Sequence, residues 1–150
     1  MESNSERQRM VNPRKAYPVD PGLIPVFDRS GRANVGHALE TAVLIELERR
    51  RSEVTYVRTP AGYEVDFLAR DATGSMELIQ VCADAADAAT ATRELRALAS
   101  AGRQFPRAGK RLITLTGAAA AVPPPPGTAV PAAAEWFLAP YADPPAAGTE

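Results

Sequence analysis

The sequence lacks several features that would place it in a specialised class of proteins. It has 150 residues and a single cysteine, so no internal disulfide can form and a reducing compartment fits. No apolar run approaches the roughly 20 residues of a membrane-spanning helix, and the polar start "MESNSERQRM" lacks the apolar core of a signal peptide. The formal net charge is −1, so no global charge attracts nucleic acid or a membrane surface. We therefore expect a cytoplasmic protein without a membrane partner.

Enough apolar residues are present for one packed domain, since they make up 45% of the chain against 23% charged residues. Segment 1–12 is polar, and we expect it to be disordered. Prolines exclude a long helix in 13–32, which we expect to be a packed irregular arm. The α/β core is expected over 33–117. Residues 118–150 read as a Pro/Ala-rich linker and a C-terminal segment, whose stretch "AAAEWFLAP" packs back on the domain.

The strongest pattern in the core is a helix from Val35 to about Arg51. Apolar residues recur there at three- and four-residue steps and form one stripe. Glu46 and Arg50 are four residues apart, and we expect them to pair on the wet side of the helix. The basic run around Arg50 is flanked by acids, which favours a solvated helix end.

Three strands, a second helix and a fourth strand follow. The strands are rich in β-branched and aromatic residues, while leucines and alanines mark the buried side of the second helix. The expected ranges are, in chain order, 53–59, 63–70, 75–82, 84–102 and 110–117. This order predicts an α/β fold with an α-β-β-β-α-β core and a mixed central sheet.

The turn between the second and third strands predicts their register. Asp71 at its first position and Gly74 at its fourth favour a three-residue loop that closes with a bulge and pairs Asp71 with Ser75. Side chains alternate along a strand, so an unbroken ladder places six of them on one face. These six form the pairs Leu68–Leu78, Asp66–Gln80 and Glu64–Cys82.

Oxygen-bearing side chains of this hairpin and of the first helix form the candidate site. Asp66 and Gln80 lie opposite each other in the expected register, and Glu40 lies beside the apolar stripe of the helix. His37 is one turn before Glu40 and can reach the same place. A partly buried carboxylate needs a partner, and Mg²⁺ takes carboxylate oxygens together with water and phosphate oxygens. Such an ion can activate water and polarise a phosphodiester.

Five stretches of the chain, taken together, resemble a known family. They are "NPRKAYPVDPGL", "GHALETAVLIELERR", "GYEVDFLA", "LIQVC" and "TATRELRAL". In this order they resemble the C-terminal domain (DUF4143) of a family of prokaryotic AAA-type ATPases, and they cover most of residues 12–116. The order of elements and the spacing of Glu40, Asp66 and Gln80 also look like the PD-(D/E)XK restriction-endonuclease-like superfamily. The resemblance implies a restriction-endonuclease-like core.

In that superfamily a helix glutamate, a strand aspartate and an acid-x-lysine motif bind metal and activate water. The resemblance assigns Glu40 as the helix acid and Asp66 as the strand aspartate. Glu64 shares the expected face of Asp66, so we expect it to support them as a metal ligand, with Mg²⁺ or Mn²⁺ as the ion. The stretch "QVC" falls where the acid-x-lysine belongs. Gln80 brings a neutral oxygen, and Cys82 cannot replace a lysine ammonium. An active form is therefore expected to be a divalent-metal-dependent phosphodiesterase or nuclease without the usual lysine.

The resemblance also implies an AAA-type ATPase domain or subunit as partner, and DNA or RNA as a further ligand. The chain has no G-x-x-x-x-G-K-[ST] phosphate loop, so we expect a fragment, a free-standing version or the partner of a separate ATPase. Three functions stay open: a nuclease-like accessory domain, a non-catalytic module that binds protein or nucleic acid, and a truncated product without activity of its own. The net charge of −1 favours protein as the ligand.

Each candidate residue also has a purely structural explanation. Asp66 can accept a hydrogen bond from a neighbouring backbone amide, and Gln80 can bridge the first helix and Asp66. Glu40 can pair with an arginine such as Arg58. Glu64 can lie at the rim of the sheet and contact only water.

Four further residues are expected to lie outside the site. Arg93 and Glu94 open the second helix, and a solvated helix face is the favoured interpretation for both. Cys82 is expected to be an inert buried thiol, because no lysine or histidine near it in sequence would lower its pKa. His37 is most simply a histidine on the helix surface.

Overall fold

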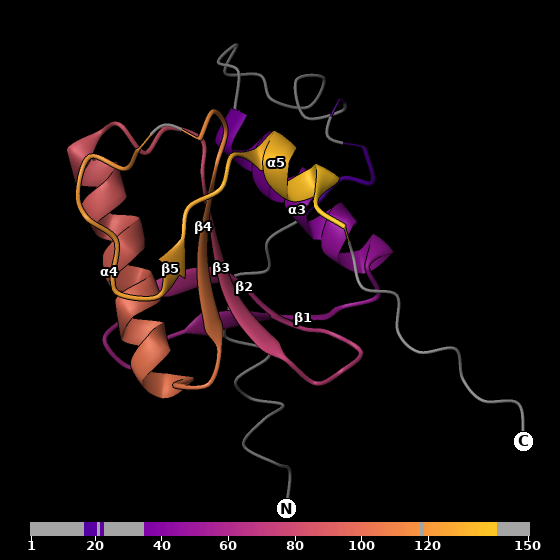
Figure 1. Ribbon diagram of the computed structural model, residues 1–150, viewed down its shortest axis with the longest axis horizontal. Helices are drawn as coiled ribbons and strands as arrows, with labels where there is room; N and C mark the ends of the chain where they lie inside the picture. Colours follow the sequence, from indigo (N-terminus) through magenta and orange to yellow (C-terminus); the bar gives the residue numbers. More distant parts are fainter. Residues whose placement is uncertain (1–16, 21, 23–34, 118, 141–150) are drawn as a thin grey trace, which may run out of the picture.

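The protein is an α/β domain with a five-stranded mixed sheet and three described helices (Figure 1). The structure, a computed structural model, describes residues 17–20, 22, 35–117 and 119–140. Its elements are α3 (Val35–Arg49), β1 (Glu53–Arg58), β2 (Glu64–Arg70), β3 (Met76–Cys82), α4 (Ala88–Gln104), β4 (Gly109–Thr114), β5 (Thr128–Ala129) and α5 (Ala133–Leu138). The expected disordered segment 1–12 and most of the expected arm lie outside the described residues. No helix within the described ranges combines the length and apolar character that crossing a membrane requires.

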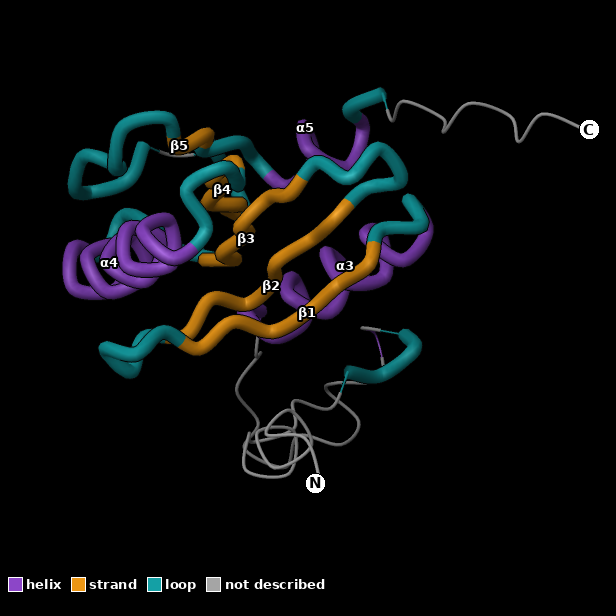
Figure 2. The backbone as a smooth tube through the Cα atoms, turned by 90° about the horizontal axis from the view of Figure 1, so that it is seen from below, coloured by secondary structure: helices purple, strands orange, loops and turns teal. Residues whose placement is uncertain are grey.

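Two helical layers enclose the sheet. The strand order is β1-β2-β3-β4-β5, with antiparallel pairing from β1 to β3 and parallel pairing from β3 to β5. Helix α4 covers one face, and α3 lies against the other (Figures 1 and 2). The α4-side core contains Leu98 and Leu112 among its buried residues. The α3-side core contains Val43 of α3 and Trp136 of α5.

Helix α4 provides the crossover that the parallel neighbours β3 and β4 require. It begins after Asp87, whose Oδ2 accepts a hydrogen bond from the Thr90 N–H at 2.7 Å. Ala91, Leu95 and Leu98 follow at three- and four-residue steps and are buried. The helix is therefore anchored to the sheet beside the end of β3.

The hairpin of β2 and β3 has the predicted turn. The Asp71 N–H donates to the Ser75 carbonyl at 3.0 Å. Gly74 has φ 88°, a left-handed conformation that glycine adopts without steric cost. Leu68 pairs with Leu78, which confirms the register close to the turn.

A β-bulge interrupts the pairing of β2 with β1 where the candidate site begins. On β1 the single residue Tyr56 faces two residues of β2, Asp66 and Phe67. Val65 and Leu68, on either side of the bulge, both pack into the α4-side core. The β2–β3 ladder ends at Phe67 and Ile79, so the expected pairs Asp66–Gln80 and Glu64–Cys82 do not form. The six side chains still lie on the α4 side, because three belong to the α4-side core and Glu64, Asp66 and Gln80 line a pocket with residues of α4.

The C-terminal end of α3 is solvated at Arg49 but covered along the side that has Glu46 and Arg50. Glu46 and Arg50 form the expected ion pair, with Arg50 Nε 2.7 Å from Glu46 Oε1, but each side chain is only 11% exposed. The Arg50 guanidinium lies 4.4 Å from the centre of the Trp136 ring, and its Nη2 donates to the Trp136 carbonyl at 2.8 Å. The expectation of a wet face is wrong here because α5 returns over this end of the helix.

Part of the proline-rich C-terminal region belongs to the folded domain. The two-residue strand β5 pairs in parallel with β4, in a stretch where the sequence predicts only a linker. The stretch "AAAEWFLAP" packs back on the domain as expected, and Trp136 is 3% exposed in the α3-side core. The sheet therefore has one more strand than the sequence predicts.

Candidate functional site

Beyond Phe67 and Ile79, the side chains of Asp66 and Gln80 make the hydrogen bonds that join β2 to β3. The Asp66 N–H donates to Gln80 Oε1 at 3.2 Å, and Asp66 Oδ2 accepts a hydrogen bond from the Val81 N–H at 3.0 Å. Both Asp66 and Gln80 are buried, with exposures of 8% and 5%. The structure thus brings Asp66 and Gln80 together through the Asp66 backbone amide, while the Asp66 carboxylate binds the next residue of β3, Val81. They do not form the ladder pair that an unbroken hairpin would have.

Glu94 of α4 is a member of this network that the sequence analysis placed in solvent. Gln80 Nε2 donates to Glu94 Oε2 at 2.6 Å, and Glu94 is 8% exposed. The exposed Arg93 pairs with the other oxygen of the same carboxylate. The prediction of a solvated face is therefore wrong for Glu94 and right for Arg93. The helical spacing could have indicated that Glu94 is buried, because Glu94 lies on the same buried stripe of α4 as Ala91 and Leu98.

Glu40 has a phenol as its partner. The Tyr17 hydroxyl donates to Glu40 Oε1 at 2.6 Å. The His37 ring stacks on Tyr17 with centroids 5.9 Å apart, and its Nδ1 lies 4.0 Å from Glu40 Oε2. The Tyr17 ring also lies beside that of Phe67, one of the two residues of the bulge, with centroids 6.1 Å apart. Nothing in the sequence spacing related Tyr17 to Glu40, because the tyrosine lies among prolines without a periodic pattern.

Burial and two carboxylates, those of Glu40 and Asp66, raise the pKa of the Tyr17 hydroxyl. Burial, the hydrogen bond to Glu40 and the negative charges of Glu40 and Asp66 hold the pKa of Tyr17 well above its usual value of 10.0. The phenol therefore stays protonated and remains a hydrogen-bond donor over the physiological range. The helix acid and the strand aspartate, expected to share a metal, thus both influence one tyrosine.

A pocket of about 370 Å³ opens beside this network. Its lining residues come from the β1–β2 turn, the facing parts of β2 and β3, and α4. They are Gly62, Tyr63, Glu64, Asp66, Gln80, Arg93, Glu94 and Ala97. Glu64 lies at the rim, with a 43% exposed side chain 4.0 Å from Arg58, and it pairs with Arg58 on β1 rather than with Cys82. Three acids and one arginine give the pocket an acidic character.

The donor set fits a divalent cation poorly. In the described part of the chain, no three histidine, cysteine, aspartate or glutamate side chains are arranged to hold a metal ion. Gln80 Oε1 already accepts the Asp66 N–H, and Glu40 Oε1 accepts the Tyr17 hydroxyl. Burial and the charge of Glu94 raise the pKa of Cys82, so it is a neutral thiol at the position of the expected lysine.

The arrangement links two strands and a helix through buried polar groups. Asp66 of β2 is bonded to β3 at Val81, and Gln80 of β3 is bonded to α4 at Glu94. A fully paired network of this kind rigidifies the site at which its members meet. Comparisons with family models, with curated proteins and with solved structures found no match for this chain.

Proposed function

We propose that this chain is a nuclease-like accessory domain of an AAA-type ATPase system, and that it binds a protein partner without cleaving nucleic acid. The resemblance of its five stretches to DUF4143 domains is the basis for the ATPase system. The order α3-β1-β2-β3-α4-β4 is compatible with the restriction-endonuclease-like core that the resemblance implies. The hydrogen bonds of Gln80 and the uncharged Cys82 favour a binding role over catalysis.

The observation that carries this proposal is the double engagement of the Gln80 amide. Its oxygen accepts the Asp66 N–H, and its nitrogen donates to Glu94 at 2.6 Å. A carboxylate at this position cannot donate a hydrogen bond and would place a second negative charge against Glu94. The local structure therefore fits a glutamine, whereas a nuclease of the resembled type has an acid there.

The neighbouring position lacks the cation that such catalysis uses. Cys82 is 5% exposed and packs in the α4-side core. Its raised pKa leaves it uncharged, so it cannot stabilise a negatively charged transition state. Arg93 is the cationic residue among those lining the pocket, and its guanidinium is paired with Glu94.

The charge around the pocket favours a protein partner over nucleic acid. Glu64, Asp66 and Glu94 outnumber Arg93, and the whole chain has a net charge of −1. A nucleic-acid site instead gains most of its affinity from cations that neutralise phosphates. An acidic pocket with an exposed arginine at its edge suits a partner that presents basic side chains.

One set of assays tests the absence of catalysis. The wild type and Asp66→Asn are incubated with plasmid and single-stranded DNA in Mg²⁺ or Mn²⁺, and each ion is titrated calorimetrically into both proteins. We expect neither cleavage nor saturable heat at millimolar metal. Cleavage by the wild type that disappears in Asp66→Asn would overturn the proposal and establish a metal-dependent nuclease.

A charge swap tests the Gln80–Glu94 pairing itself. Gln80→Glu is expected to lower the free energy of unfolding by about 1–3 kcal/mol, because it removes a buried donor and adds a like charge. The double variant Gln80→Glu, Glu94→Gln restores one donor and one acceptor and is expected to recover most of this loss. Equal stability of the single variant and the wild type in urea would show that the pairing does not select glutamine.

The partner is tested with a purified AAA-type ATPase from the same organism, using titration calorimetry and matched DNA titrations at two salt concentrations. Saturable binding to the ATPase, weakened by the charge reversal Glu64→Lys at the exposed rim of the pocket, supports the proposal. Salt-dependent binding to DNA with no binding to the ATPase would instead favour a nucleic-acid-binding module.

A further inference from the structure

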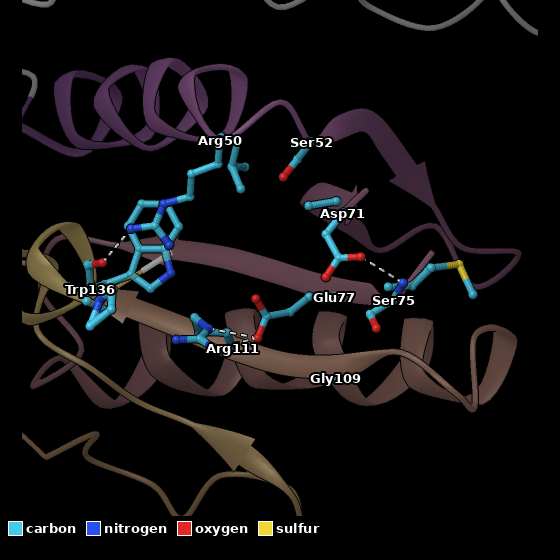
Figure 3. A pocket seen from close by; sticks show the side chains of 13 residues that line it. Arg50, Ser52, Asp71, Ser75, Glu77, Gly109, Arg111 and Trp136 are labelled. Atoms are coloured by element: carbon cyan, nitrogen blue, oxygen red, sulfur yellow. Dashed lines mark hydrogen bonds and ion pairs between the residues drawn. The ribbon is translucent and has the colours of Figure 1, made fainter. Parts of the chain in front are cut away.

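A second pocket lies at the opposite end of the sheet from Asp66 and Gln80 (Figure 3). Its volume is about 380 Å³, which is at the lower end of the range for small-molecule sites. The end of α3, the β2–β3 turn, the start of β4 and the end of α5 contribute its walls. The two pockets share only the strands β2 and β3, and helix α4 lines the first pocket alone.

An ion pair on the floor of this pocket uses only one oxygen of its carboxylate. Arg111 Nε and Nη2 lie 2.8 and 2.7 Å from the same atom, Glu77 Oε1. The side chains of Arg111 and Glu77 are 28% and 30% exposed. Glu77 Oε2 and Arg111 Nη1 make no hydrogen bond to another described residue, so each can still bind a ligand group.

A second carboxylate points into the same space from the β2–β3 turn (Figure 3). Asp71 Oδ1 accepts hydrogen bonds from the N–H groups of Thr73 and Ser75, at 2.8 and 3.0 Å. The hydrogen bonds from Thr73 and Ser75 hold the pKa of Asp71 below its usual value, so the group is ionised at neutral pH. Within the described residues, Asp71 Oδ2 has no hydrogen-bond donor.

The opposite wall is rigid and partly aromatic. The Arg50 guanidinium is stacked on Trp136 and bonded to Glu46 and to the Trp136 carbonyl, which fixes it in place (Figure 3). Leu47, Ala69 and Met76 add apolar surface. The charged residues that line the pocket are two arginines, Arg50 and Arg111, and two acids, Asp71 and Glu77.

The pocket therefore presents both signs of charge in equal number beside apolar surface, with the Arg111–Glu77 pair on its floor and Asp71 and Arg50 on different walls. A simple anion would meet the two carboxylates, and a simple cation would meet the two guanidinium groups. A ligand that has an ammonium and a carboxylate a few atoms apart satisfies both ends at once. We propose that this pocket binds a small zwitterion of the α-amino acid class, with its ammonium between Asp71 and Glu77 and its carboxylate at Arg111.

The chain provides a direct optical probe for this proposal. Its single tryptophan, Trp136, lines the pocket, so its fluorescence reports on this place alone. Free α-amino acids, their N-acetyl derivatives and their C-terminal amides are each titrated into the wild type. We expect a saturable fluorescence change with one or more free amino acids, and a loss of binding of at least about tenfold when either the ammonium or the carboxylate is blocked.

Two matched variants locate the site. Glu77→Gln keeps an acceptor oxygen for Arg111 but removes the charge, and we expect it to weaken binding by about tenfold or more. Glu64→Gln removes a similarly exposed acid that lines the other pocket, and it should bind like the wild type. Circular dichroism confirms that both variants are folded.

Three results would overturn the proposal. One is the absence of a saturable change with any free amino acid at millimolar concentration. Another is equal binding of the free and N-acetylated forms, which would show that the carboxylate alone is recognised. The third is equal loss of binding in Glu77→Gln and Glu64→Gln. None of these results bears on the partner or the nuclease assays, which probe the other end of the sheet.

Discussion

Gln80 of β3 donates its side-chain N–H to Glu94 of α4 at 2.6 Å, and both residues are buried. The oxygen of the same amide accepts the backbone N–H of Asp66, so one side chain connects two strands and a helix. Both ends of this amide are needed, because a buried polar group without a partner destabilises the folded state. The candidate site therefore also stabilises the packing of α4 on the sheet.

Removing the acceptor on α4 should expose this structural role. Glu94→Ala leaves Gln80 Nε2 without its partner, and we expect the free energy of unfolding to fall by about 1–3 kcal/mol. Urea denaturation followed by circular dichroism measures the change. Glu48→Ala is the matched control, since Glu48 is an exposed helical glutamate, and it should stay within about 0.5 kcal/mol of the wild type. Equal losses in both variants would contradict the pairing.

Tyr17 should make the domain sensitive to alkaline pH. Its pKa is raised in the folded state by burial and by Glu40, whereas an unfolded tyrosine ionises near 10.0. Proton release from the unfolded chain therefore lowers stability as the pH rises above about 10. Unfolding in urea at increasing pH should show a steeper loss in the wild type than in Tyr17→Phe. Parallel pH profiles for the two proteins would show that Tyr17 ionises normally in the folded state.

Glu46 should contribute to stability only above acidic pH. The hydrogen bonds from Arg49 and Arg50 lower the pKa of Glu46 from 4.5 to about 2. The folded state therefore gains stability from this carboxylate above pH 4.5, and it loses that gain as the pH falls from 4.5 toward about 2. Acid titration in urea should give a flatter profile for Glu46→Gln than for the wild type. Glu48→Gln, an exposed neighbour, should reproduce the wild-type slope.

The C-terminal segment should contribute strongly to stability through one side chain. Trp136 is 3% exposed and packs with the α3-side core, so Trp136→Ala is expected to cost about 3–5 kcal/mol. Leu138 of the same helix is 84% exposed, and Leu138→Ala should change stability by less than about 0.5 kcal/mol. Thermal and urea unfolding distinguish the two. A small effect of Trp136→Ala would show that α5 is dispensable for the core.

The local features of the hairpin were predictable from sequence, and its interruption was not. Asp71 and Gly74 have side-chain and backbone preferences that select one turn, so the pairing of Leu68 with Leu78 followed. The bulge at Asp66 and Phe67 has no comparable signature, because neither residue is a glycine and the stretch alternates polar and apolar residues like a regular strand. The β2–β3 ladder ends beside this bulge, at Phe67 and Ile79, so the pairs expected beyond it do not form.

Burial of charged residues was the other source of error. Glu94 and Arg50 are both buried by partners that are distant in sequence, Gln80 and Trp136. Helical periodicity places Glu94 on an apolar stripe, but a glutamate there is ordinarily interpreted as a boundary of that stripe. Arg50 becomes buried only because the chain returns after a proline-rich stretch that also contains the unpredicted strand β5. Such returns depend on tertiary packing, which local patterns do not encode.

The shortness of α5 has a consequence for the order of folding. A helix of six residues, Ala133–Leu138, is too short to persist alone in water, so it forms only as Trp136 docks. The meander of β1, β2 and β3 has short connections and can assemble early, whereas the docking of α5 closes a much longer loop. The aromatic wall beside Arg50 is therefore expected to be completed last in folding and to open first when the domain begins to unfold.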